Sequence, residues 1–423
     1  MSISPTLAVN EQIARRRAAG LPTVALGFGE ASIPVHPELV RRLADAAPNA
    51  SYGAVAGLEA LRDSAAGYLS RRGVLSEAHQ VVAAPGSKPL LYAILGAIGG
   101  PVVLPRPSWV SYAAQAALQG IEVVRIPTPP GEGGVPDPAL IEAEATRRAG
   151  AGEPLRTVLV TVPDNPTGTV ASPETVRHLV EVAERHDLLV ISDEIYLDLV
   201  HDGTPVLTPS ALAPERTIVT TGLSKNLALG GWRIGVARFP ATDSGQQIQE
   251  QVTFAASEIW SAPAQPVQHV AAWAFTEPEV LLAHVAASRR LHGLVAGAVV
   301  GCFRDLGAEV PEPRAGFYLY PDLEPLRAAL AARGITTSPA LAGVLLTDLG
   351  IATLPGAAFG DDPARLTLRV ATPMLYGADD DRRAQALGAI EPTRLPWIAR
   401  DLDTVRRGLA GLLAGAREAG RTR

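Results

Sequence analysis

Lysine is scarce in this sequence: it occurs only at Lys88 and Lys225, among 37 lysines and arginines. A lysine amine can lose its proton and attack a carbonyl, whereas an arginine guanidinium stays protonated. Lys225 follows Ser224 just past an apolar run, and Arg233 comes eight residues later. An aldehyde cofactor held covalently needs such an amine, and a phosphate group needs a fixed cation with forked donors. The spacing predicts a covalently held, phosphate-bearing cofactor, although alone it also fits a solvated loop.

A carboxylate and a phenol follow a second apolar run. Asp193 comes directly after the run 188–192, and Tyr196 lies three residues further on. A carboxylate beside a pyridine nitrogen keeps that nitrogen protonated and makes the ring an electron sink. The phenol could then reach the neighbouring ring hydroxyl. An aspartate at this place is also a common helix N-cap, so both interpretations stay open at this point.

Three more loops after apolar runs carry polar or aromatic groups. Gly86, Ser87 and Lys88 join a predicted strand to a predicted helix, where free backbone N–H groups can bind a phosphate. Asn165 lies in an Asn-Pro-Thr-Gly sequence that reads locally as a turn but also offers an amide donor. Trp109 follows another run and could stack on a planar ring or belong to the core.

Short apolar runs that alternate with helix-length segments must position these loops. The alternation predicts an α/β fold with a mostly parallel, seven-stranded sheet and helices on both faces. In such sheets ligands bind beyond the carboxyl ends of the strands, where the loops above lie. The predicted strands are 81–84, 101–104, 121–126, 157–162, 188–192, 217–221 and 232–237, and the helices between them are 88–98, 109–118, 138–148 and 173–186.

Beyond about residue 245 helical patterns dominate, and they indicate a smaller α+β domain. We predict an N-terminal segment (1–45) packing with the small domain, a large cofactor-binding domain (46–290) and a small C-terminal domain (291–423). Within the last we expect strands at 316–321, 351–354 and 366–370, and helices at 323–333 and 398–416.

The five loops together, in this order and spacing, resemble those of the fold-type I, class I/II aminotransferases of the aspartate aminotransferase superfamily. The resemblance runs from Leu26-Gly27-Phe28-Gly29-Glu30 to Leu368-Arg369-Val370-Ala371, nearly the whole chain, and the scarcity of lysine gives it an actinobacterial-type composition. It implies pyridoxal 5′-phosphate (PLP) as cofactor.

The resemblance also implies a role for each motif residue. Lys225 would be the Schiff-base lysine and proton shuttle, Asp193 the partner of the ring nitrogen, and Asn165 and Tyr196 the donors to the ring oxygen. Trp109 would stack on the ring, and Gly29 would close over the substrate carboxylate. The phosphate would be held by Gly86, Ser87, Lys88, Ser224, Arg233 and, from a neighbouring subunit, Tyr52.

The implied phosphate and substrate ligands leave two points open. Many members of the family have a serine three residues before the lysine, whereas this chain has Gly222, so Ser224 or Thr221 would supply that hydroxyl. Arg369 fits the ligand of the substrate α-carboxylate best, with Arg365 as the alternative.

The predicted activity is PLP-dependent transfer of an amino group between an L-amino acid and a 2-keto acid, by a homodimer with shared active sites. A PLP-dependent lyase, replacement enzyme or oxidase of secondary metabolism is the alternative on the same fold. The net charge of -6 and the absence of a basic patch argue against nucleic acid as partner. The single cysteine and the lack of an apolar leader or membrane span predict a cytoplasmic protein, and no metal site is predicted.

Overall fold

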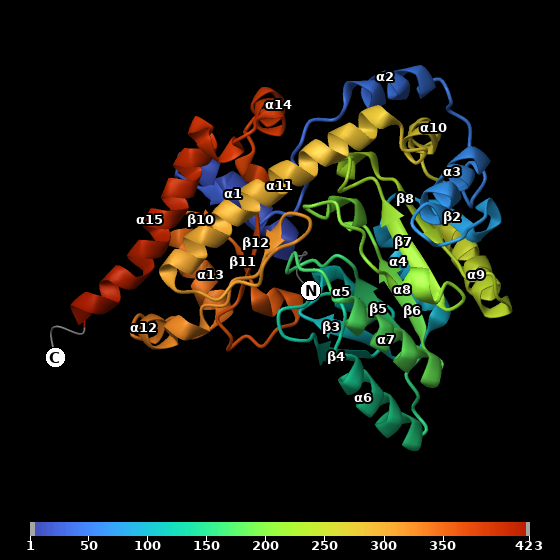
Figure 1. Cartoon of the computed structure of the whole chain (residues 1–423), viewed down its shortest axis with the longest axis horizontal. Helices are drawn as coiled ribbons and strands as arrows, with labels where there is room; N and C mark the ends of the chain where they lie inside the picture. Colours follow the sequence, from blue (N-terminus) through green and yellow to red (C-terminus); the bar gives the residue numbers. More distant parts are fainter. Residues whose placement is uncertain (1–4, 420–423) are drawn as a thin grey trace.

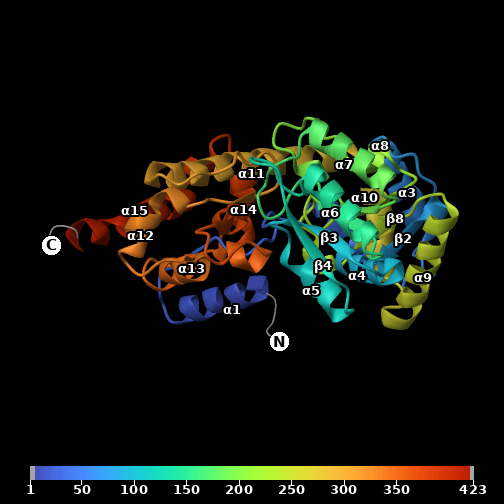
Figure 2. The same ribbon diagram turned by 90° about the horizontal axis from the view of Figure 1, so that it is seen from below.

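The computed structural model describes residues 5–419 and has two lobes, one built on a large sheet and one smaller (Figure 1). The long helix α11 (Glu279–Leu306) runs from one lobe into the other. Seen from below, α1 (Pro5–Ala18) lies under the smaller lobe beside α13 (Ser338–Thr347) (Figure 2). The functional loops predicted above therefore belong mainly to the larger lobe.

The large sheet has seven strands in the order β2-β8-β7-β6-β5-β3-β4, and only β8 runs antiparallel to its neighbours. This confirms the predicted mostly parallel α/β sheet. The strands are short, and except for the edge strand β4 almost all of their residues are buried, as expected for parallel strands covered by helices on both faces. Their bounds are β2 (Val81–Ala84), β3 (Val102–Arg106), β4 (Val123–Pro127), β5 (Thr157–Thr161), β6 (Leu189–Asp193), β7 (Thr217–Gly222) and β8 (Gly235–Arg238).

Alternate residues of each strand enter different hydrophobic cores, because successive side chains point to opposite faces. Leu159 of β5 packs in the core formed with α4 (Ser87–Ile98), α5 (Val110–Leu118) and α9 (Asp243–Ile259). Its neighbours Val158 and Val160 pack in the core formed with α6 (Pro138–Gly150) and α7 (Pro173–Arg185). The faces of the sheet are thus taken up by helix packing, which leaves the strand ends and the loops beyond them to reach the ligand edge.

Two N-terminal helices and α10 (Gln265–Ala274) cover the β2 edge of the sheet. Leu39 of α2 (Pro37–Ala46) and Leu61 of α3 (Glu59–Ser70) share a core with Val81 and Val270. The guanidinium of Arg42 also lies 4.0 Å above the Trp273 ring of α10. The segment that carries Tyr52 is held between α2 and α3.

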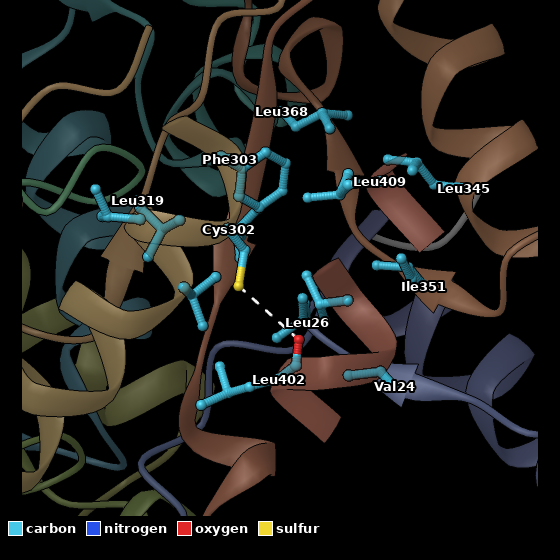
Figure 3. Packing of buried hydrophobic residues seen from close by; sticks show 14 of the residues in the cluster. Val24, Leu26, Cys302, Phe303, Leu319, Leu345, Ile351, Leu368, Leu402 and Leu409 are labelled. Atoms are coloured by element: carbon cyan, nitrogen blue, oxygen red, sulfur yellow. Dashed lines mark hydrogen bonds between the residues drawn. The ribbon is translucent and has the colours of Figure 1, made fainter. Parts of the chain in front are cut away.

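The smaller lobe has a three-stranded antiparallel sheet, β11-β12-β9, and a parallel pair, β1-β10. Figure 3 shows its core, in which Leu26, Phe303, Leu368 and Leu409 converge, and Cys302 Sγ donates to the carbonyl of Leu402 at 3.9 Å. The elements are β1 (Val24–Ala25), β9 (Tyr318–Leu319), β10 (Ile351–Ala352), β11 (Leu354–Pro355), β12 (Leu368–Ala371), α12 (Arg327–Ala331), α14 (Asp380–Gly388) and α15 (Pro396–Ala419).

The predicted and observed elements differ mainly where strands are short. The expected strand 232–237 begins only at Gly235, because residues 230–232 form a 3-10 turn. The expected helix 323–333 is a 3-10 turn followed by the short α12. The domain limits at residues 45 and 290 stay a prediction, and the second falls inside α11. Within residues 5–419, no helix combines the length and apolarity that a membrane crossing requires.

Candidate active site

A cavity of about 330 Å³ opens at the carboxyl ends of the parallel strands. Most of the residues that the sequence singled out line it: Gly29, Ser87, Lys88, Trp109, Asn165, Asp193, Tyr196, Ser224, Lys225, Arg233 and Arg369. They come from the ends of β2, β3, β5, β6 and β7 or the loops that follow, from the segment after β1, and from β12 of the smaller lobe. The fold therefore brings residues separated by hundreds of positions into one pocket.

Lys225 lies three residues past the end of β7, in a loop that is fixed by hydrogen bonds of the next residue, Asn226. Its ammonium donates to the carbonyl of Gly29 at 2.8 Å. The next residue, Asn226, donates to Asp198 at 2.7 Å and accepts the Leu227 N–H at 2.9 Å. Both bonds fix the loop backbone, so the lysine stem starts from a defined point and only its flexible end moves.

Asp193 ends β6 and is aimed into the pocket rather than capping a helix. One carboxylate oxygen accepts from the Tyr112 hydroxyl at 2.7 Å, and that hydroxyl also lies 2.8 Å from Thr161 Oγ1. The other oxygen, Oδ1, is buried and has no hydrogen-bond partner among residues 5–419. Burial raises the pKa of the carboxyl to about 6. A buried acceptor left open in this way suits a ligand that brings a proton on a ring nitrogen.

Asn165 and Tyr196 lie side by side beyond β5 and β6. The Asn165 amide donates to the Tyr196 hydroxyl at 3.2 Å, and both residues are buried. Together they present two polar hydrogens to the same part of the pocket. Burial raises the pKa of the Tyr196 phenol well above its ordinary value, so it remains a neutral donor.

Glycines shape the predicted phosphate cup so that a cation and backbone amides can converge. Gly86 has φ +94°, and a Cβ there would come within 3.0 Å of Arg233 Cζ. A Cβ on Gly235 would overlap the Ser87 amide nitrogen. The guanidinium of Arg233 donates to the carbonyls of Gly230 at 2.8 Å and Pro85 at 3.1 Å. The free N–H groups at the start of α4 complete a site suited to a phosphate.

The absence of a serine at position 222 has a steric reason here. A Cβ on Gly222 would come within 2.7 Å of the Ile234 carbonyl and 3.0 Å of Gly235 Cα. Of the two substitutes considered, Ser224 lines the pocket, whereas Thr221 Oγ1 is turned toward the Glu194 carbonyl at 3.5 Å. The geometry favours Ser224 as the hydroxyl that can face a phosphate.

Arg369 and Arg365 occupy different environments. Arg369 is buried to 1% exposure in β12, donates to the Gly27 carbonyl at 2.7 Å and lines the pocket. Its Nε has no partner among residues 5–419, and burial lowers the pKa of its guanidinium. Arg365 forms an ion pair with Asp322 outside the pocket. Of these two arginines, Arg369 is the one that offers a buried cation without an ion-pair partner to an incoming carboxylate.

Tyr52 is the one predicted ligand that lies away from the pocket. Its side chain is 96% exposed, in the loop that precedes α3. Gly86, which does not line the cavity itself, lies behind the cup at the N-cap of α4. The single chain therefore brings together every predicted site residue except Tyr52.

The sequence profile of the family described as aminotransferase class I and II matches residues 24–386. This chain belongs to that aminotransferase family. A probable aspartate/prephenate aminotransferase of Thermus aquaticus is 31% identical over 369 residues, which cover 85% of this chain and 91% of the relative. The aspartate aminotransferase of Geobacillus stearothermophilus is 30% identical, with 86% and 91% covered.

Solved structures agree with the family. The aspartate aminotransferase of Thermus thermophilus with maleate superposes with a TM-score of 0.80 at 26% identity, covering 96% of this chain and 97% of that one. The aminotransferase is thus a fold-type I, PLP-dependent enzyme of amino acid metabolism that transfers amino groups between amino and keto acids. The alternative of a lyase, replacement enzyme or oxidase is not favoured.

The donor set fits PLP by its own chemistry. The open Oδ1 of Asp193 suits a protonated ring nitrogen, and the glycine-lined cup with Arg233 suits a phosphate. The Trp109 ring lies beside the pocket and meets Tyr112 edge to face at 5.1 Å between centroids. Lys225 lines the same cavity as Asn165 and Tyr196, and a lysine amine can condense with an aldehyde.

Sequence reasoning missed two phenols in the aminotransferase, Tyr112 and Tyr318. Tyr112 lies three residues after Trp109, on the same side of α5, and this helical spacing was the available signal. Tyr318 was noted only as part of a strand, but its hydroxyl lies 3.0 Å from that of Tyr196. Tyr112 and Tyr318 contact the predicted residues Asp193 and Tyr196 through tertiary packing, and for Tyr318 no local sequence pattern marks that contact.

Proposed function

We propose that the amino donor of this aminotransferase is an acidic amino acid of the L-aspartate type and that a 2-keto acid is the acceptor. The observation that carries this proposal is a surplus cation. The pocket holds Lys88, Lys225, Arg233 and Arg369. We assign Lys225 and Arg233 to the cofactor and Arg369 to the α-carboxylate, and only the backbone of Lys88 to the phosphate. Lys88 is the fourth, and a second carboxylate would balance it.

The position of Lys88 supports a contact with the substrate side chain. Its ammonium lies 5.1 Å from the centre of the Trp109 ring, within the cavity. Partial burial, together with Arg233 and Lys225, lowers its pKa. An anionic side chain would relieve this repulsion, so binding would favour the charged ammonium. Relatives described as aspartate or aspartate/prephenate aminotransferases are consistent with such a donor.

The proposed division of labour follows from the contacts. Arg369 binds the α-carboxylate, and Gly29 allows the chain to close over it. Lys225, as a neutral amine released from the cofactor, would take the α-proton as general base and return it on the cofactor side, and its Nζ lies 2.8 Å from the Gly29 carbonyl at the substrate end. Asp193, Asn165 and Tyr196 hold the ring, and Trp109 stacks on it. When bound, PLP supplies the electron sink that stabilises the negative charge left by proton removal.

We also propose a homodimer in which Tyr52 binds the phosphate of the partner's site. The Tyr52 side chain is 96% exposed, so covering its apolar ring with a partner subunit would contribute favourable free energy to association. Gly53, the neighbour of Tyr52, packs against the side chain of Gln265, which follows α9. Phe254 and Ile259, in the last turns of α9, are also exposed, so this side of the lobe offers apolar groups to a partner.

The single cysteine, which rules out an intramolecular disulfide, is in keeping with a cytoplasmic location.

The donor proposal is tested with Lys88→Ala and a panel of amino donors at saturating 2-oxoglutarate. We expect kcat/KM for L-aspartate to fall by about 100-fold, the typical effect of losing a charged hydrogen bond, and that for L-phenylalanine to change by less than about threefold. Equal losses for both donors would assign Lys88 to the cofactor instead. A wild-type enzyme that does not use L-aspartate would contradict the proposed donor outright.

A further inference from the structure

Tyr318 joins the substrate end of the pocket to the cofactor end. It opens β9 and pairs with Ala371 of β12, two residues from Arg369, so the two side chains share one face. The guanidinium of Arg369 lies 5.0 Å from the centre of the Tyr318 ring. At its other end, the Tyr318 hydroxyl contacts the phenol of Tyr196 at 3.0 Å.

The Tyr318 hydroxyl has more acceptors within reach than it has protons. It donates to the Gly29 carbonyl at 3.3 Å, and the Tyr196 oxygen lies 3.0 Å away. A hydroxyl carries one proton, so it can satisfy only one of these acceptors fully at a time. The Gly29 carbonyl has a second donor, the Lys225 ammonium at 2.8 Å. This second donor is present only while Lys225 carries no cofactor; once the amine is bound to the cofactor, Tyr318 is the one of these two donors that remains for the Gly29 carbonyl.

Because Tyr318 and Tyr196 are buried, the acceptor that the Tyr318 proton chooses affects the strength of the remaining hydrogen bonds. Tyr318 is exposed to 1% and Tyr196 to 4%, so water does not replace a lost hydrogen bond. A Cβ on Gly29 would overlap the Tyr318 hydroxyl and come within 2.9 Å of Arg369 Nη1. The loop, the hydroxyl and the guanidinium are therefore packed against one another, and a shift of one displaces the others.

We propose that Tyr318 is a positioning residue whose single proton, shared between the Gly29 carbonyl and the Tyr196 hydroxyl, couples the loop over the substrate to the donor at the cofactor's ring oxygen. When the proton turns to Tyr196, that phenol is polarised and becomes a stronger donor. When it turns to Gly29, the loop is held and Tyr196 donates more weakly. This inference rests on the proposed roles of Tyr196 and Lys225.

The coupling has a spectroscopic consequence in the enzyme loaded with PLP. A donor to the ring oxygen stabilises its negative charge and so weakens its hold on the proton of the neighbouring Schiff-base nitrogen. Loss of the Tyr318 hydroxyl weakens that donor and should raise the pKa of the Schiff base. The expected rise is about half to one pH unit, the equivalent of one ordinary hydrogen bond.

The test is a double-mutant cycle read from the visible absorbance of the loaded enzyme as a function of pH, without substrate. The variants are Tyr318→Phe, Tyr196→Phe and the double variant. We expect each single change to raise the Schiff-base pKa, and Tyr318→Phe to add no further rise in the Tyr196→Phe background. The charged groups Asp193, Arg233 and Arg369, with Lys88 and Glu30, are the same in all four proteins.

The outcomes separate the coupling from the roles on which it rests. A Tyr196→Phe enzyme that titrates as the wild type would overturn the role of Tyr196. If Tyr196→Phe shifts the pKa but Tyr318→Phe does not, or if the shift by Tyr318→Phe is undiminished in the double variant, the coupling through Tyr196 is wrong.

A matched control and a second perturbation complete the design. Tyr320→Phe removes a buried hydroxyl from the same segment, but its partners are Asp361 and Thr367 outside the pocket, so it should titrate as the wild type. Gly29→Ala keeps the Tyr318 hydroxyl but displaces it, and it should raise the pKa in the same direction. This variant decides the question if Tyr318→Phe does not yield folded enzyme, and an unchanged pKa in Gly29→Ala would then overturn the coupling.

Discussion

At the scale of single residues, Arg369 and Arg365 show how burial assigns a role that spacing leaves open. The two arginines are four positions apart in the sequence and could share a face of an extended strand. In the fold only Arg369 lies in β12, while Arg365 comes before the strand and is held by Asp322. The carboxylate of an amino acid can therefore neutralise the first but not the second.

This difference predicts opposite results for two identical substitutions. Arg369→Lys should raise KM for both amino and keto acid and lower kcat/KM by roughly 100-fold, because an ammonium cannot form the forked pair. Arg365→Lys should leave kcat/KM within about twofold. Steady-state kinetics with both substrates checks this, and comparable losses in the two variants would argue against a carboxylate site at Arg369.

Most of the pocket was predictable from residue types, whereas its supporting contacts were not. Lys225, Asp193 and Asn165 follow apolar runs at strand ends, and that placement alone brings them to one edge of the sheet. Tyr112 and Tyr318 act through hydroxyls that meet other side chains, and such meetings depend on tertiary packing. The open Oδ1 of Asp193 also depends on tertiary packing, because Tyr112 donates only to the other carboxylate oxygen.

At the scale of elements, the loop between β5 and α7 holds Asn165 by means of a buried acid. Asp164 Oδ2 accepts from the Thr167 N–H at 3.1 Å and from its hydroxyl at 2.6 Å, while Oδ1 has no partner among residues 5–419. Burial raises the pKa of this carboxyl from 3.8 to about 7. The turn that the sequence predicted here is thus built around an uncompensated carboxyl.

The stability of the cofactor-free protein should therefore depend on pH through Asp164. Because its pKa is raised on folding, the folded chain keeps a proton that the unfolded chain has lost, and the resulting stability is lost as pH rises through about 7. Asp164→Asn can keep the acceptor toward Thr167 and adds no charge. Relative to the wild type, its free energy of unfolding should rise by about 2–3 kcal/mol between pH 5 and pH 8.

Urea unfolding at these two pH values measures the difference. Asp137→Asn, at the partly exposed N-cap of α6, is the control for removing one carboxylate. An Asp164→Asn protein whose stability relative to the wild type does not change with pH would show that the buried carboxyl does not titrate in this range.

The elements themselves were predicted best where burial is greatest. Strands β5 and β6 each contain three consecutive apolar residues and are almost wholly buried, which is the pattern typical of parallel strands covered on both faces. The strands of the smaller lobe have two to four residues, too few for a period to appear. The sequence did not predict helices α1 to α3 as separate elements. Their stability comes from packing against distant parts of the chain, which no local pattern shows.

At the scale of the whole molecule, the site is assembled from both lobes. The large sheet supplies the groups for the cofactor, and β9 and β12 bring Tyr318 and Arg369 to the substrate end. The continuous helix α11 connects the lobes, so a movement between them would change the distance from Arg369 to the cofactor groups. The family match and the curated relatives extend over the same assembled chain.

The central claim is that Lys225 holds the cofactor, and the scarcity of lysine makes it directly testable. The enzyme loaded with PLP is reduced with borohydride, which fixes the Schiff base, and its peptides are mapped by mass. Because Lys88 and Lys225 are the only lysines in the sequence, only these two side chains can carry the adduct. We predict the adduct on Lys225, unchanged in Lys88→Ala and absent, together with turnover, in Lys225→Ala. An adduct on Lys88, or one that persists after Lys225→Ala, would contradict the account.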